Sequence, residues 1–236
     1  MNAGVVHQRL GRYQLGMIRT MTPSQGAALL KLIEAPNGTQ MNAVLAGRGT
    51  VTYGEVPGLG RVVVKRYHRG GLLGKINRAT HVRSGLVRSR AEFERLVQVR
   101  GLGVSAPEPL GYVFSGFLLY NAWLVMREIE HHHSLAALSQ SDEDLARENT
   151  EQLAEDISRL VEARIYHVDL HPGNVLVDQT GNRFLIDFDK AVDFHGSRND
   201  LRDRYLVRWR RAVIKHELPE FLSEILSAAL RKHFEA

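Results

Sequence analysis

The sequence predicts an α+β fold in two lobes, an antiparallel β-sheet lobe with one main helix and then a smaller, mostly helical lobe. Short β-like runs with glycine turns fill residues 41–67, and more such runs follow before residue 127. Beyond residues 127–130 the apolar residues recur at helical spacing instead. A chain of 236 residues is long enough for two modest lobes that share a cleft. We therefore expect a single domain over residues 1–236, with an N-terminal lobe over 1–127 and a C-terminal lobe over 128–236.

The composition narrows the class of protein without choosing a function. A hydrophobic fraction of 44% with only 7 prolines is typical of a globular chain. The absence of cysteine excludes disulfides and thiolate metal sites. No long apolar run or secretory signal is present, so we expect a cytoplasmic protein without a membrane span. The net charge of +5 suits a nucleotide, a phosphorylated substrate, an anionic membrane surface or a nucleic acid alike.

The N-terminal lobe begins with a polar, weakly patterned segment and a short helix. Pro23 opens this helix, and Pro36-Asn37-Gly38 stops it. Three antiparallel strands are expected next, at residues 44–46, 50–53 and 61–67, with glycine turns between them.

Two features of these strands are candidates for contact with a nucleotide. Gly47 and Gly49 belong to a turn whose backbone amides can approach phosphates without interference from a Cβ atom. Glycine hairpins are common, so this turn alone is a weak indication. Lys65 ends a Val-Val-Val run, where the local pattern favours a solvated lysine at a strand end. The basic, glycine-rich residues 69–75 suit an anionic substrate and a flexible loop equally well.

A helix over residues 88–100 and three more strands complete the lobe. Glu92 and Glu94 lie in the first half of the helix, where the helix dipole favours negative charge in any protein. The further strands are expected at residues 110–114, 117–120 and 123–126.

The C-terminal lobe is expected to hold three long helices. Ser141-Asp142-Glu143-Asp144 is a helix-start signature, and the helix continues to Ala163. A strongly basic amphipathic helix is expected over residues 197–217, and a final helix over 220–234. One stripe of the basic helix comprises Arg204, Arg208, Arg211 and Lys215. The stripe is typical of a solvated helix face, and a sharper interpretation adds contact with anionic lipid headgroups or a phosphorylated acceptor.

The strongest chemical signal is the segment His167-Val168-Asp169-Leu170-His171-Pro172-Gly173-Asn174, followed by Ile186-Asp187-Phe188-Asp189. Two short apolar runs flank turn-forming residues 178–182, which predicts a β-hairpin. The hairpin would place Asn174 and Asp187 side by side at its open end. With Asp169 next to them, these oxygen-bearing side chains indicate a site for a divalent cation and an acid/base group.

In chain order, these signals match the parts that phosphoryl transfer needs. The reaction uses backbone amides and a lysine on the nucleotide phosphates, and a glutamate that holds the lysine. It also uses two metal ligands and a carboxylate that orients and deprotonates the acceptor hydroxyl. One such element occurs often by chance, but five in the right order do not. We therefore expect a kinase.

The order and spacing over roughly residues 41–217 resemble the protein-kinase-like fold. The catalytic loop of that fold resembles His167-Val168-Asp169 with Asn174, and its metal-binding motif resembles Asp187-Phe188. More narrowly, the chain is similar to the bacterial lipopolysaccharide core kinases, and in particular to 3-deoxy-D-manno-octulosonic acid (Kdo) kinases. The narrower likeness rests on residues 47–50, 66–75 and 185–190. Enzymes of this family transfer the γ-phosphate of ATP to a Kdo hydroxyl on the lipid A precursor, at the cytoplasmic face of the inner membrane.

The resemblance implies a role for each matching residue. Asp169 would be the catalytic base, Asn174 and Asp187 would hold Mg²⁺, and Lys65 would contact the α- and β-phosphates of ATP. Glu92 is the expected partner of Lys65, because the family's Glu-Phe pair fits Glu92-Phe93.

Three further assignments follow from the same resemblance. Glu94 is the alternative partner of the lysine. Met126, Glu128 and Ile129 belong to the expected hinge, which would offer backbone groups to adenine. His167 would brace the catalytic loop through hydrogen bonds and would not transfer protons.

Departures from protein kinases bear on the acceptor. The glycine loop lacks a third glycine, His171 stands where a lysine is usual, and Asp189 stands where a glycine is usual. No Ala-Pro-Glu segment follows, and the C-terminal lobe is too short for a peptide-docking groove. We therefore expect a small or lipid-borne acceptor and an anionic membrane surface as partner.

Three other functions fit part of this sequence pattern. A heptose kinase or an aminoglycoside-type phosphotransferase would share the fold and the catalytic residues. A non-catalytic ATP-binding scaffold would have no need of the complete set Lys65, Asp169, Asn174 and Asp187. A nucleic-acid-binding module rests on charge alone, so we expect no nucleic-acid partner.

Overall fold

The computed structural model describes residues 4–35, 50–67, 81–82, 86–117 and 119–235. The described chain has the α+β composition that the sequence predicts, and it divides into two compact units. The first unit holds the described residues up to Val97 together with Glu108–Glu128. The second holds Gln98–Pro107 and everything from Ile129 onward.

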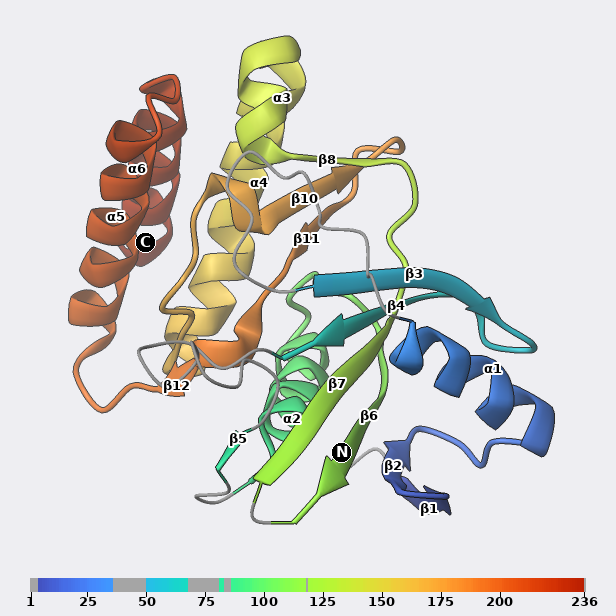
Figure 1. The fold of residues 1–236 in the computed structure, drawn as a ribbon. Helices are drawn as coiled ribbons and strands as arrows, with labels where there is room; N and C mark the ends of the chain where they lie inside the picture. Colours follow the sequence, from blue (N-terminus) through green and yellow to red (C-terminus); the bar gives the residue numbers. More distant parts are fainter. Residues whose placement is uncertain (1–3, 36–49, 68–80, 83–85, 118, 236) are drawn as a thin grey trace. The chain divides into compact units, whose positions relative to one another are not determined.

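The described strands of the first unit form one antiparallel sheet in the order β1-β2-β6-β7-β4-β3, with β5 paired to β7 (Figure 1). Their bounds are Val6–Leu10 (β1), Tyr13–Met17 (β2), Thr50–Val56 (β3), Gly60–Arg66 (β4), His81–Val82 (β5), Pro109–Gly116 (β6) and Leu119–Arg127 (β7). The predicted strands at 50–53 and 61–67 correspond to β3 and β4, and the expected strand at 44–46 lies outside the described residues.

Two of the strand predictions for this unit were wrong. The sequence predicted no strand before the first helix, but β1 and β2 form a hairpin there. Residues in β1 alternate between partly buried and exposed. Most of its side chains are polar, so the sequence lacks the apolar pattern by which a strand is usually recognised. Residues 117–120 and 123–126 were expected as separate strands, yet β7 continues through both without a turn. Its pairing with β6 and β4 on either side supplies the hydrogen bonds that keep it extended.

Helix α1 (Pro23–Glu34) and helix α2 (Arg88–Gly101) accompany this sheet. Thr22 caps α1 in a capping box, with Pro23 at its first position, as the sequence predicts. Leu29 and Ile33 of α1 join a buried cluster with Val62 and Val64 of β4. Because side chains alternate along a strand, Lys65 of β4 lies on the opposite face from this cluster.

The second unit combines four helices with two small antiparallel sheets. The helices are α3 (Leu135–Ser141), α4 (Glu143–Glu162), α5 (Arg198–Lys215) and α6 (Phe221–Glu235). One sheet has the order β11-β10-β8, and the other pairs β12 with β9. These strands are His132–Ser134 (β8), Ile165–Tyr166 (β9), Val175–Asp178 (β10), Arg183–Leu185 (β11) and Val192–Asp193 (β12). Two short 3₁₀ helices, Pro172–Asn174 and Phe188–Lys190, lie in the segments that carry the candidate site.

The helices of the second unit pack through the apolar faces that the sequence predicts. Helix α5 lies beside α6 and α4 (Figure 1). Leu201, Tyr205 and Trp209 of α5 are buried, and Trp209 donates a hydrogen bond from Nε1 to the Leu222 carbonyl at 3.0 Å. Burial of a large aromatic side chain contributes several kcal/mol, so this seam fixes α5 against α6.

A buried carboxylate on α4 ties distant segments into the second unit. Asp156 is fully buried and accepts hydrogen bonds from the Ser105 amide at 3.0 Å and from Nε of Arg183 at 2.8 Å. Burial raises the pKa of Asp156, against the lowering effect of Arg183. The Leu185 amide also donates to the Ser105 carbonyl at 2.8 Å. These contacts explain why Gln98–Pro107 belongs to this unit.

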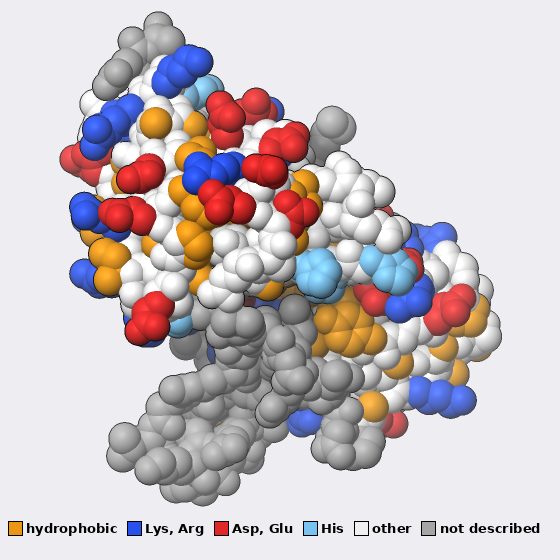
Figure 2. Space-filling view, turned by 90° about the horizontal axis from the view of Figure 1, so that it is seen from above, with side chains coloured by type: hydrophobic (Ala, Val, Ile, Leu, Met, Phe, Trp, Pro, Cys, Tyr) orange, Lys and Arg blue, Asp and Glu red, His pale blue; other side chains and the backbone are white. Residues whose placement is uncertain are grey.

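Charged side chains on the surface are mixed in sign. On the face displayed in Figure 2, acidic and basic side chains are interspersed. Helix α4 contributes i,i+4 pairs of this kind, such as Arg147 with Glu143 at 2.6 Å. Such exposed pairs contribute little to stability, since solvent screens them.

Candidate active site

The segment that carries Asp169 is fixed by a buried histidine. His167 is fully buried, and its Nε2 lies 2.9 Å from the Ile186 carbonyl, to which the neutral imidazole donates. Its backbone amide donates to the Tyr205 hydroxyl at 2.8 Å, which in turn donates to the Ile165 carbonyl at 2.8 Å. Burial lowers the pKa of His167, so the ring stays neutral. His167 therefore links the Asp169 segment to the residue before Asp187.

The hairpin predicted after Asn174 is present, and it brings Asn174 next to the Asp187 segment. Strands β10 and β11 pair Val175 with Leu185, and the Ile186 amide donates to the Asn174 carbonyl at 3.0 Å. The Asn174 side chain donates from Nδ2 to the backbone carbonyl of Asp169 at 3.0 Å. This bond orients the amide and leaves its oxygen as the group available to a cation.

Asp187 adopts an unusual backbone conformation at the start of a 3₁₀ helix. Its φ of 66° lies in the left-handed region, which is unfavourable for a residue with a Cβ atom. Strain of this kind gathers at functional sites. The next residue, Phe188, is buried, with its ring centre 4.5 Å from that of His167. Packing of Phe188 against the histidine therefore holds the strained turn in place.

Two positively charged side chains contact the Asp169 carboxylate, one at each oxygen. Lys190 Nζ lies 2.7 Å from Oδ2, and Arg208 Nη2 lies 3.1 Å from Oδ1. The sequence pattern did not indicate these partners, although Lys190 follows the Asp187 motif and Arg208 belongs to the basic stripe of α5. They lie 21 and 39 residues from Asp169, so only tertiary packing brings them together.

His171 carries no charge at neutral pH. Burial, followed by the charge of Arg208, lowers its pKa to about 4. Its Nδ1 accepts a hydrogen bond from the Gly173 amide at 3.1 Å, which shapes the turn before Asn174. This position, where protein kinases usually carry a lysine, therefore holds a neutral ring. The positive charge beside Asp169 comes from Lys190 and Arg208 instead.

In the first unit, partly buried Lys65 forms an ion pair with the buried Glu92. Lys65 Nζ lies 3.0 Å and 2.9 Å from the two carboxylate oxygens of Glu92. The Tyr67 hydroxyl also contacts this carboxylate. Glu94 points elsewhere and pairs with Arg90 at 2.7 Å on the exposed side of α2. The geometry thus selects Glu92 over Glu94 as the partner of Lys65.

The remaining candidate residues are placed as follows. Met126 lies in β7, opposite Val63 of β4. Glu128 donates its backbone amide to the Arg61 carbonyl at 3.2 Å, and its carboxylate binds the Arg61 side chain at 2.9 and 3.0 Å. The Ile129 carbonyl lies 2.6 Å from Nδ1 of His132. Gly47 and Gly49 lie outside the described residues, as do residues 69–75.

The oxygen donors of the second unit fit a magnesium ion in kind. Asn174 and Asp187 offer an amide oxygen and a carboxylate, which hard divalent cations prefer. Within the described residues, no three His, Asp or Glu side chains cluster closely enough to hold an ion by themselves. Mg²⁺ is commonly bound by one or two protein oxygen ligands together with substrate phosphates and water.

Comparison with known proteins identifies relatives of this chain. The model of the lipopolysaccharide kinase (Kdo/WaaP) family matches residues 39–221. A protein of Mannheimia succiniciproducens named 3-deoxy-D-manno-octulosonic acid kinase is 35% identical over 178 residues, which cover 72% of this chain and 73% of the relative. Proteins of the same name from Pasteurella multocida and Xylella fastidiosa are 37% and 32% identical, again over 72% of this chain and over 73% and 68% of their own lengths.

Proposed function

Because this chain belongs to the lipopolysaccharide kinase (Kdo/WaaP) family, we propose that it phosphorylates a Kdo hydroxyl on the lipid A precursor, with ATP as phosphoryl donor. The chain is a sugar kinase, as its relatives named 3-deoxy-D-manno-octulosonic acid kinase indicate. One structural observation carries the assignment of the chemistry to particular residues. The Asp169 carboxylate, the Asn174 amide and the start of the Asp187 turn are held together by His167 and by the β10–β11 hairpin.

In the proposed reaction, Asp169 accepts the proton of the acceptor hydroxyl as that oxygen forms a bond to the γ-phosphorus. The bond between the γ-phosphorus and the bridging oxygen breaks, and ADP leaves with that electron pair. Lys190 and Arg208, 2.7 and 3.1 Å from the two carboxylate oxygens, hold Asp169 in one orientation for this step. A base that is already oriented pays no entropic cost when the acceptor arrives.

Lys65 and residues 126–129 are the candidates for contact with the nucleotide. Lys65, oriented by Glu92, would contact the α- and β-phosphates, and backbone groups of Met126, Glu128 and Ile129 remain the candidates for adenine. Because the Glu128 amide already donates to Arg61, an adenine contact there falls to its carbonyl or to its neighbours.

Asn174 and Asp187 would hold Mg²⁺, and Gly47 and Gly49 would lie at the phosphates. When bound, Mg²⁺ neutralises charge that develops on the transferred phosphoryl group. The Asn174 side chain is prepared for this role, because its nitrogen is already occupied by the Asp169 carbonyl. Removal of free Mg²⁺ by a chelator should abolish transfer and leave the melting temperature of the protein without nucleotide unchanged.

Peripheral attachment to the cytoplasmic face of the inner membrane is part of the proposal. In the described part of the chain, no helix combines the length and the apolar character needed to cross a bilayer. Helix α5 instead exposes Val207 and Ile214, which are 62% and 66% accessible. Arg211 lies one helical turn after Val207, and Lys215 is the residue next to Ile214. A face with large apolar side chains flanked by cations suits an anionic lipid surface.

Vesicle sedimentation tests this attachment. The protein should sediment with phosphatidylglycerol vesicles at low salt, less so at high salt, and not with neutral phosphatidylcholine vesicles. Replacement of Ile214 by Ser together with Lys215 by Gln should weaken the sedimentation. Failure to sediment with anionic vesicles at low salt would rule the attachment out.

An acceptor panel tests the proposed activity. The protein is incubated with ATP, Mg²⁺ and either the Kdo-lipid A precursor, a heptose-bearing core acceptor or an aminoglycoside, and the products are weighed by mass spectrometry. The proposal predicts one added phosphoryl group on the Kdo acceptor. Transfer only to the heptose acceptor or only to the aminoglycoside would show that Kdo is not the substrate. ATP binding without transfer to any acceptor would indicate a non-catalytic protein.

A further inference from the structure

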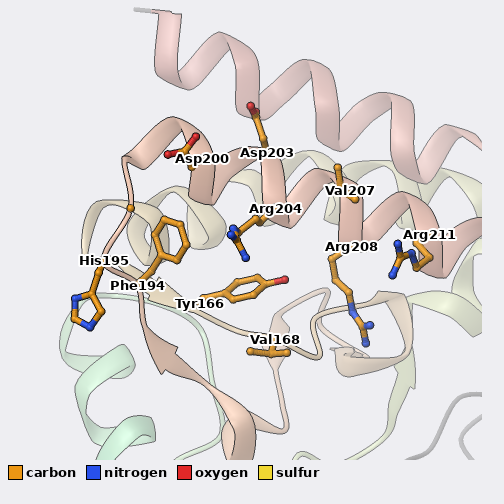
Figure 3. A pocket seen from close by; sticks show the side chains of 11 residues that line it. Tyr166, Val168, Phe194, His195, Asp200, Asp203, Arg204, Val207, Arg208 and Arg211 are labelled. Atoms are coloured by element: carbon orange, nitrogen blue, oxygen red, sulfur yellow. The ribbon is translucent and has the colours of Figure 1, made fainter.

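The second unit contains a cavity of about 750 Å³ whose lining includes Val168, the residue before Asp169. Three segments line it: Tyr166 and Val168 before the base, the Phe194–Gly196 turn, and one side of α5 (Figure 3). The volume lies within the range of small-molecule binding sites, which combine apolar or aromatic walls with a few polar groups.

The cavity and the candidate base share a residue. Arg208 lines the cavity and donates from Nη2 to Oδ1 of Asp169 at 3.1 Å. Val168, the residue before Asp169, forms another part of the lining. A molecule in this cavity would therefore contact the arginine that binds the Asp169 carboxylate. The Nε of Arg208 is buried and makes no hydrogen bond to the described residues, so the guanidinium retains a donor.

Two more arginines supply positive charge to the cavity. Arg204 and Arg211 extend from α5 toward the cavity on either side of Arg208 (Figure 3). Within the described residues, neither of them has a carboxylate within ion-pair distance. The Arg204 guanidinium is positioned by the Phe194 ring, 5.2 Å from its centre.

The two carboxylates in the lining are already engaged. Asp200 accepts from the Ser197 amide at 3.3 Å and from its hydroxyl at 2.7 Å, as part of the capping box of α5. Asp203 pairs with Arg202 at 2.9 Å. Asp200 also interacts electrostatically with Arg204, and the three arginines outnumber the two carboxylates, so the lining carries an excess of positive charge.

We propose that this cavity is the acceptor site and that Arg204 and Arg211 bind the carboxylate of an acidic sugar. This inference rests on the proposed function and deepens it. The sugar named in the relatives is an acid, and so carries a carboxylate at neutral pH, whereas a heptose carries none. Arginine binds carboxylates through charge-assisted, often bidentate hydrogen bonds. The rings of Tyr166 and Phe194, 6.5 Å apart, provide apolar surface for the sugar ring.

The cavity thus explains how a sugar kinase selects an acidic acceptor. Arg204 and Arg211 hold the carboxylate, and Arg208 connects the cavity to Asp169 through its hydrogen bond. A hydroxyl of the bound sugar is thereby presented to the base. A neutral sugar would leave the two arginines without a partner, and a site whose charged groups stay unpaired rejects such a ligand.

Steady-state kinetics of Arg204→Gln, Arg211→Gln and the double variant test the proposal. The acceptors are the Kdo-lipid A precursor and the same molecule with its sugar carboxylate converted to the neutral carboxamide. Arg231→Gln serves as the matched control, because Arg231 is an exposed arginine on α6 outside the cavity. Melting curves and the KM for ATP verify that each variant is folded, and single variants remain informative if the double variant is unstable.

Wild type and Arg231→Gln should prefer the carboxylate over the carboxamide by roughly tenfold or more. Each cavity variant should raise the acceptor KM by roughly tenfold with an unchanged KM for ATP, and the double variant should lose the preference for the carboxylate. Variants that keep both the acceptor KM and the preference would overturn the cavity proposal while the Kdo kinase activity stands. A wild-type protein that does not phosphorylate the Kdo acceptor would instead overturn the proposed function, and the acceptor site with it.

Discussion

Replacement of Asp169 by Asn separates catalysis from stability, because the change keeps the shape of the side chain and removes its charge. The Asp169 carboxylate is 25% exposed, and its partners Lys190 and Arg208 are 64% and 33% exposed. Ion pairs this open to solvent contribute about 0–1 kcal/mol. We expect the free energy of unfolding to fall by about 1 kcal/mol in total, which lowers the melting temperature by about 2–4 °C for a chain of this size.

The effect of this substitution on turnover should be far larger. General base catalysis contributes about 10²–10⁴ in rate, which corresponds to about 2.7–5.4 kcal/mol of activation free energy. Initial rates of phosphoryl transfer to the Kdo acceptor measure this loss, and calorimetry with ATP shows whether nucleotide affinity is retained. Turnover within twofold of wild type, in a variant that binds ATP normally, would remove Asp169 from the mechanism.

Three further predictions follow from individual contacts. Replacement of Glu92 by Gln removes the charge that orients Lys65, so the KM for ATP should rise by roughly tenfold in steady-state assays while the acceptor KM stays constant. Replacement of Asp156 by Ala removes the fully buried carboxylate that Arg183 and the Ser105 amide contact, and should cost about 3–5 kcal/mol in urea unfolding. Replacement of its exposed neighbour Glu155 by Ala should cost under about 1 kcal/mol. The pKa of His171 is lowered from 6.5 to about 4, so the unfolded chain takes up this proton first as the pH falls. The stability that His171 contributes is therefore complete above pH 6.5 and is lost toward pH 4. Melting temperatures between pH 7 and pH 5 should fall less steeply in His171→Gln than in wild type.

The part of the site that the sequence predicted is the part built from local structure. Turn residues between two short apolar runs predict a hairpin, and the hairpin alone places Asn174 beside the Asp187 segment. The side of β4 on which Lys65 lies follows from strand alternation, but its pairing with Glu92 rested on a family resemblance. Local periodicity does not say which helix covers a given face of a sheet.

The features that the sequence did not predict depend on contacts between distant segments. Lys190 and Arg208 reach Asp169 only after the 3₁₀ turn and α5 have packed. The basic stripe of α5 was interpreted as a solvated face, with contact to anionic lipid headgroups or a phosphorylated acceptor as the sharper interpretation. In the structure Arg208 contacts Asp169, and Arg204 and Arg211 line a cavity. Helical spacing indicates that such residues share a face, and only the neighbouring chain decides whether that face meets solvent or a ligand.

The most direct test of the central assignment is the mass of the Kdo-lipid A precursor after incubation with the purified protein, ATP and Mg²⁺, with the Asp169→Asn variant in parallel. We predict that wild type adds one phosphoryl group to the Kdo sugar and that the variant leaves the precursor almost unmodified over the same time. An unmodified precursor in the wild-type reaction, or equal phosphorylation by the variant, would contradict the assignment of Asp169 as the base of a Kdo kinase.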